Sequence, residues 1–129
     1  MSPRRSASSW GRSGHAQIVL TTRQLATLVK AGMPLLRALR TVSDQLDSGQ
    51  FRDVFSSVSA DVESGVKLSD ALARQPKYFP HFYVNMVRAG ELGGLLDTIL
   101  TRLAELLEKQ ARLRQIGRAS CRERVWRYV

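Results

Sequence analysis

The sequence lacks most of the side chains from which catalytic and metal sites are built. It has one cysteine, Cys121, among 129 residues, so no internal disulfide can form and an oxidising compartment is not required. Its two histidines, His15 and His81, stand far apart, and no HExxH or CxxC pattern accompanies them. Neither a GxxxxGK(S/T) phosphate loop nor a GxSxG nucleophile elbow occurs. We therefore predict that the protein is not an enzyme and requires no cofactor.

Long apolar runs are also missing. No uninterrupted apolar stretch approaches the roughly 18–20 residues that a transmembrane helix needs. Residues 1–15 are rich in serine and arginine but have no apolar core, which argues against a secretory signal. With 43% apolar and 24% charged residues, the chain has the composition and length of one globular domain.

The formal net charge of +9 is concentrated at the two ends of the chain. Residues 1–19, 20–114 and 115–129 each contribute +3, so the long central segment is nearly balanced. A nucleic-acid module more often carries its basic face on the folded part. We therefore expect no nucleic-acid partner. The high isoelectric point of about 10.8 keeps a small basic helical nucleic-acid-binding protein as the alternative, and a generic helical adaptor as a third.

The spacing of apolar residues is helical almost throughout, and no segment alternates as a strand would. We predict an all-α fold, a compact six-helix bundle. The predicted helices cover residues 22–31, 34–46, 51–62, 69–72, 82–90 and 95–113.

Capping residues and apolar faces support these boundaries. Thr22 and Ser69 are expected to cap the first and fourth helices. Gly90 is expected to end the fifth helix, whose Phe82 and Tyr83 should point inward. The last helix has the longest apolar stripe, formed by Leu95, Leu96, Ile99, Leu100, Leu103, Leu106, Leu107 and Leu113.

The two ends fit this pattern poorly. We expect residues 1–19 to be a disordered basic tail and residues 20–114 to form the helical domain. Residues 115–129 have no helical apolar stripe and resemble a translated vector or a frame-shifted end. We therefore expect a non-native or disordered tail there, and it carries no functional argument.

The stretch from Ala89 to Asp97 is the most distinctive. Its glycines permit turns and close helix contacts, and Glu91 and Asp97 place two carboxylates near a helix start. The simpler interpretation is a helix–turn–helix corner. A cation site is the alternative, although two carboxylates are too few for calcium unless a subunit interface supplies more ligands. The glycines predicted to act as hinges or close-contact positions are Gly32, Gly65, Gly90, Gly93 and Gly94.

Three ordered blocks resemble a known family. The first runs over residues 22–39, with Arg23, Gln24, Leu25 and Pro34 as its characteristic residues. The second covers residues 61–72, and the third runs from Phe79-Pro80 through the Gly90 corner to Glu108. Together they are similar to the inner-membrane platform proteins of type II secretion systems and type IV pilus assembly.

The resemblance implies a six-helix domain on the cytoplasmic face of the bacterial inner membrane. It implies a non-enzymatic scaffold that links the assembly ATPase to pilins or pseudopilins and to other inner-membrane components. It also implies a homodimer, with calcium held at the dimer interface by Glu91 and Asp97. Arg37, Arg40, Arg52 and Asp53 are candidate contacts for the ATPase, and the alternative for each is simple solvation.

The chain departs from the family pattern in two ways. It has one copy of the domain where family members carry two, and no membrane helix follows residue 114. We therefore expect an excised first cytoplasmic domain or a truncated gene product. The resemblance does not separate a secretion system from a pilus machine.

Overall fold

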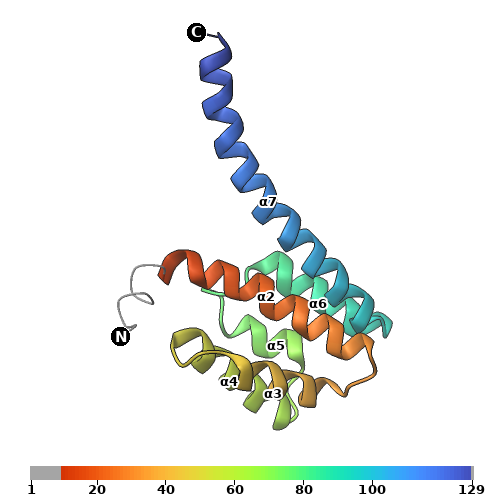
Figure 1. The fold of residues 1–129 in the computed structure, drawn as a ribbon. Helices are drawn as coiled ribbons and strands as arrows, with labels where there is room; N and C mark the ends of the chain where they lie inside the picture. Colours follow the sequence, from red (N-terminus) through yellow and green to blue (C-terminus); the bar gives the residue numbers. More distant parts are fainter. Residues whose placement is uncertain (1–9, 129) are drawn as a thin grey trace.

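The chain folds as an all-α bundle in the computed structural model, as the apolar spacing predicts (Figure 1). The structure describes the backbone of residues 10–128 and the side chains of residues 15–114. This part contains six helices and no strand: α2 (Trp10–Lys30), α3 (Leu35–Gln45), α4 (Gln50–Glu63), α5 (Leu68–Ala73), α6 (His81–Gly93) and α7 (Leu96–Tyr128). Among the described helices, none combines the length and the hydrophobicity that a membrane span requires.

The helices form two groups that share one core. α2, α6 and α7 lie together, and α7 continues beyond them (Figure 1). α3, α4 and α5 lie below α2 in the same view. Helices that follow one another along the chain pack as neighbours, whereas the pairing of α2 with α7 joins the first helix to the last.

The first helix begins earlier than predicted. Thr22 is not a cap, because α2 starts at Trp10 and Thr22 lies in its interior with 1% of its surface exposed. The hydroxyl of the neighbouring Thr21 donates a hydrogen bond to the carbonyl of Gln17, one turn earlier in the helix. A threonine can therefore sit inside a helix when its hydroxyl has a partner. Residues 10–19 belong to α2, so the prediction of a tail over them is wrong; residues 1–9 lie outside the described part.

Two other predicted helix ends differ in the structure. Ser69 is not a cap, because the cap position of α5 is Lys67, whose side chain makes no capping hydrogen bond. α6 does not stop at Gly90 and continues to Gly93, because the residue that adopts the left-handed conformation is Gly94, with φ of +69°. A glycine permits a helix to end but does not require it to.

The backbone after Gln115 is helical rather than disordered, since α7 extends to Tyr128. Arginine, which occurs four times in residues 115–129, favours helix even without an apolar stripe. The side chains beyond Arg114, including Cys121, lie outside the described part of the chain. The prediction that this segment is non-native stays a prediction.

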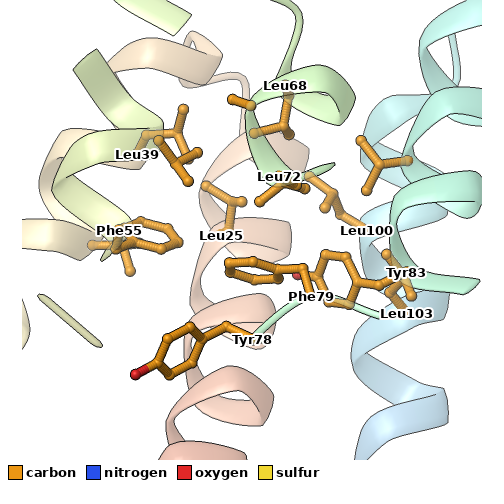
Figure 2. Packing of buried hydrophobic residues seen from close by; sticks show 14 of the residues in the cluster. Leu25, Leu39, Phe55, Leu68, Leu72, Tyr78, Phe79, Tyr83, Leu100 and Leu103 are labelled. Atoms are coloured by element: carbon orange, nitrogen blue, oxygen red, sulfur yellow. The ribbon is translucent and has the colours of Figure 1, made fainter. Parts of the chain in front are cut away.

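The core joins both groups of helices through a cluster of aromatic rings. Phe79 is buried, and its ring lies beside that of Tyr83 (Figure 2). The ring centroid of Phe79 is 5.2 Å from that of Tyr83 and 6.4 Å from that of Phe51. Phe51 also stacks on Phe55 and meets the edge of Tyr78. Such ring pairs add about 0.5–1.5 kcal/mol beyond the apolar area that they bury.

Not every predicted core residue is buried. Phe82 remains 39% exposed, because the buried face of α6 is formed by Tyr83, Val84, Val87 and Gly90. Leu95, Leu106 and Leu113 are also exposed. The buried stripe of α7 is therefore narrower than its leucine content suggests, because only one side of a helix can face a single core.

A buried hydrogen bond connects α2 to α6. The hydroxyls of Thr22 and Tyr83 lie 2.6 Å apart, and both residues are almost fully buried. Burial raises the pKa of Tyr83 to about 12, so the phenol stays neutral at physiological pH. Each hydroxyl is thus the partner that satisfies the other inside the core.

We expect Thr22→Val and Tyr83→Phe each to lower the free energy of unfolding by about 1–3 kcal/mol, because each leaves a buried hydroxyl unpaired. The double variant should lose less than the sum of the two, since no unpaired group remains. Urea unfolding followed by circular dichroism measures these changes. Thr27→Val, at an exposed position of the same helix, is the control and should change stability by under about 0.5 kcal/mol. Strict additivity would contradict a coupled pair.

Candidate functional site

The stretch from Ala89 to Asp97 forms a tight corner between α6 and α7. Gly94 is left-handed, and the amide of Leu95 donates to the carbonyl of Gly90 over 2.9 Å. This local hydrogen bond, which spans five residues, satisfies a carbonyl at the end of α6, and the chain turns directly into α7. The corner is therefore a defined structural element.

Gly90 lies where the two helices touch. A β-carbon at this position would meet Cβ and Cγ1 of Ile99 at 3.0 Å and the backbone Cα of Leu96 at 3.2 Å. Because one of these atoms belongs to the backbone of α7, it cannot move aside as a flexible side chain would. The absent side chain of Gly90 thus sets the distance between α6 and α7.

Glu91, the next residue, reaches toward α5. Its Oε2 accepts a hydrogen bond from the backbone amide of Ser69 over 2.9 Å, and its Oε1 accepts one from the Ser69 hydroxyl over 2.6 Å. Ser69 is 1% exposed and lies in the first turn of α5. A carboxylate at this position satisfies a free amide and faces the positive end of the helix dipole.

The carboxylate of Glu91, a residue of α6, therefore caps the N-terminus of α5 in place of a side chain from α5 itself. Gly90 faces α7 and Glu91 faces α5, so adjacent residues connect three helices. The sequence predicts Ser69 as a cap of its own helix and offers Glu91 as a candidate metal ligand, with a simple helix–turn–helix corner as the other interpretation. The contact between them was not anticipated.

Asp97 lies in the first turn of α7, and its Oδ1 accepts a hydrogen bond from the amide of Thr98 over 2.8 Å. Within the described residues, no group of three or more histidine, cysteine, aspartate or glutamate side chains could hold a metal ion. One copy of this chain therefore does not fit calcium at the corner by itself, since calcium takes six to eight oxygen ligands.

The other predicted hinge glycines differ from one another. Gly32 and Gly65 follow α2 and α4 with φ of +100° and +105°, conformations that other residues adopt rarely. Gly93 is helical, and a β-carbon there would meet nothing within 4 Å. Gly93 therefore provides no close contact.

Arg23 and Glu108 form another connection between distant segments. Arg23 Nε donates to Oε2 of Glu108 over 2.8 Å, and Nη2 donates to Oε1 over 2.7 Å, so the pair is bidentate. This hydrogen bond raises the pKa of Arg23 and lowers the pKa of Glu108. Since the folded-state pKa of Glu108 is depressed, its contribution to stability is present above its unfolded pKa and is lost as pH falls through the folded value. About a third of each side chain is exposed, so the contribution is modest.

The remaining family-motif residues have structural positions. Leu25 and Phe79 belong to the core, and Gln24 is half-buried. Pro34 and Pro80 stand directly before α3 and α6, where a missing amide costs nothing and the fixed φ suits a helix start. These positions show that the motif residues form the core and begin the helices of the domain.

The four candidate ATPase contacts lie on α3 and α4. Arg40 forms an exposed ion pair with Glu63, which joins these two helices. Arg37 and Asp53 are exposed, and Arg52 is half-buried.

Near the α6–α7 corner, Leu92 is 80% exposed and Leu95 is 57% exposed. The apolar spacing predicts an interior position for Leu95, which the structure does not bear out. Exposed leucines of this kind can serve as contact residues.

Residues 21–123 match the family model described as "Type II secretion system (T2SS), protein F". The type IV pilus assembly protein PilC of Thermus thermophilus is 46% identical over 101 residues, which cover 78% of this chain and 25% of the relative. PilC of Myxococcus xanthus is 42% identical, with 75% and 23% covered. The type II secretion system protein F of Vibrio cholerae is 43% identical, with 75% and 24% covered. The chain thus spans about a quarter of the length of these curated relatives.

We expect Gly90→Ala to lower the free energy of unfolding by about 1–3 kcal/mol, because the new methyl group would press against the backbone of α7. Gly93→Ala is the matched control. It lies three residues later in the same helix with open space around it, and should leave stability unchanged or raise it by up to about 1 kcal/mol. Thermal unfolding by circular dichroism compares the two. Equal effects of both substitutions would refute the close contact.

Proposed function

Because the chain belongs to the type II secretion system protein F family, we propose that it acts as a non-enzymatic platform domain on the cytoplasmic face of the inner membrane. In this role it holds the assembly ATPase beside the pilin-like subunits and other membrane components of the machine. The observation that carries the proposal is the family match over residues 21–123. The relatives, which are named as pilus assembly and type II secretion proteins, support the same class of machine.

The geometry of the domain suits a part that transmits force. The Arg23–Glu108 pair joins α2 to α7, the Glu91–Ser69 contact joins α6 to α5, and the Thr22–Tyr83 bond joins α2 to α6. The Arg23–Glu108 and Thr22–Tyr83 contacts join helices that are distant in sequence, and the Glu91–Ser69 contact joins two successive helices. A closely packed bundle held in this way resists small deformations, so a push on one face reaches the other.

We assign the ATPase to the charged face of α3 and α4, by which we mean the surface around Arg37, Arg40, Arg52 and Asp53. Arg37 and Arg52 have no acidic partner within ion-pair distance in the described part, whereas the guanidinium of Arg40 is paired with Glu63. Unpaired surface charges are available to complement a partner and set its orientation.

We expect the full chain to bind the assembly ATPase encoded in the same genome, and Arg37→Glu with Arg52→Glu to weaken that binding about tenfold, or ~1.4 kcal/mol. Biolayer interferometry measures the affinity. Lys67→Glu with Arg102→Glu is the control, because it makes the same charge change on exposed positions of other segments and should alter binding less than about twofold. Absence of binding by the unaltered chain would overturn the ATPase assignment.

We also propose that two copies of the domain meet at the α6–α7 corner and share calcium there. Leu92 and Leu95 offer exposed apolar contact area beside Glu91 and Asp97. Since both oxygens of Glu91 already accept hydrogen bonds from Ser69, the cation must use their remaining lone pairs and ligands from the second copy.

We expect the full chain to sediment as a dimer with calcium and as a monomer after chelation, because two carboxylates from one copy are too few to hold the ion. Asp97→Asn should abolish the calcium-dependent shift, whereas Asp53→Asn, an exposed aspartate in the first turn of α4, should not. Analytical ultracentrifugation provides the readout. A monomer under both conditions at high protein concentration would exclude the shared site.

A further inference from the structure

A groove lies where α2, the α5–α6 connection, α6 and α7 meet. It has a volume of about 470 Å³ and is partly open to solvent. Its apolar surface is formed by Ile18 of α2, Phe82 and Tyr83 of α6, and Leu107 of α7. It lies away from the α6–α7 corner and from the charged face of α3 and α4, and none of their candidate residues lines it.

The apolar surface of the groove includes one large side chain that the fold leaves partly uncovered. Phe82 is 39% exposed, although its neighbour Tyr83 is 3% exposed. The prolines on either side of the connection, Pro76 and Pro80, line the same groove and restrict its backbone. A rigid, concave apolar surface of this kind can accept a side chain from a partner without first reorganising.

The polar lining of the groove has one sign of charge. Lys77 and Arg114 line it, and no aspartate or glutamate does so among the described residues. His15 lines it as well, and its buried Nε2 has no hydrogen-bond partner in the described part of the chain. Burial and the neighbouring Arg114 lower the pKa of His15, which favours its neutral imidazole, and the formal positive charges of the lining are those of Lys77 and Arg114.

We propose that this groove binds an acidic amphipathic segment of a partner protein. An apolar side chain of that segment occupies the surface beside Phe82, and its carboxylates face Lys77 and Arg114. Charge complementarity selects this occupant, because a basic segment would meet two like charges and no counter-charge. The inference rests on the proposed scaffold role, because a scaffold must bind partners. The groove is a different site from the surface assigned to the ATPase.

A synthetic amphipathic peptide with leucine and phenylalanine on one helical face and glutamate on the other tests the groove directly. A peptide with lysine in place of every glutamate is its control. Fluorescence anisotropy with the full chain should give an affinity at least about tenfold higher for the acidic peptide, since opposite charges attract and like charges repel across the groove.

Two surface substitutions locate the binding. Lys77→Glu should weaken binding of the acidic peptide about tenfold, because it reverses one of the two charges, and Phe82→Ser should do the same by removing the apolar anchor. Lys67→Glu and Leu92→Ser make matched changes at exposed positions outside the groove and should leave the affinity within about twofold. Since all four positions are exposed, the variants should fold, and circular dichroism verifies this.

Three results would overturn the inference. The first is equal affinity for the acidic and lysine peptides, and the second is acidic-peptide binding that Lys77→Glu and Phe82→Ser leave unchanged. The third is groove-dependent binding to phosphatidylglycerol vesicles in place of the peptide, which would assign the groove to a lipid surface. Because no ATPase is present, loss of peptide binding and loss of ATPase binding are independent results.

Discussion

The contact between α6 and α7 at Gly90 is the constraint on which the other connections depend. Only a residue without a side chain lets the helices approach until Ile99 and Leu96 meet the backbone of α6. At this separation α7 lies against α2 as well, which brings Glu108 to Arg23. The same short segment holds Glu91 in reach of α5. Helix separation, the ion pair and the capping of α5 are thus consequences of one close approach.

The polar contacts have a different role from the apolar core. Burial of the apolar core, which includes the aromatic cluster around Phe79, drives collapse, and this hydrophobic contribution is not directional. The Thr22–Tyr83 bond and the Glu91–Ser69 contact depend on direction, because each is satisfied in one arrangement of the helices only. Directional contacts at buried positions select one packed state among several that would bury a similar area.

The fold was predictable from the sequence, whereas the contacts that organise the site were not. Apolar spacing located six helices because each signal is local, and the glycines at positions 32 and 65 marked real helix ends. The partner of Glu91 is 22 positions away and that of Arg23 is 85 positions away, and no local pattern encodes either pairing. Periodicity also could not decide which of two adjacent aromatic residues, Phe82 and Tyr83, would face the core.

The pairing of α2 with α7 has a consequence for biosynthesis. The helices between them can form local hairpins as they leave the ribosome, because their contacts are short in sequence. The apolar face of α2 lacks most of its cover until α7 has been synthesised, because α7 packs on it more extensively than α3 does. The nascent chain must therefore hold an incomplete bundle until translation has passed Glu108, and during that interval it presents α2 to chaperones or to another nascent copy.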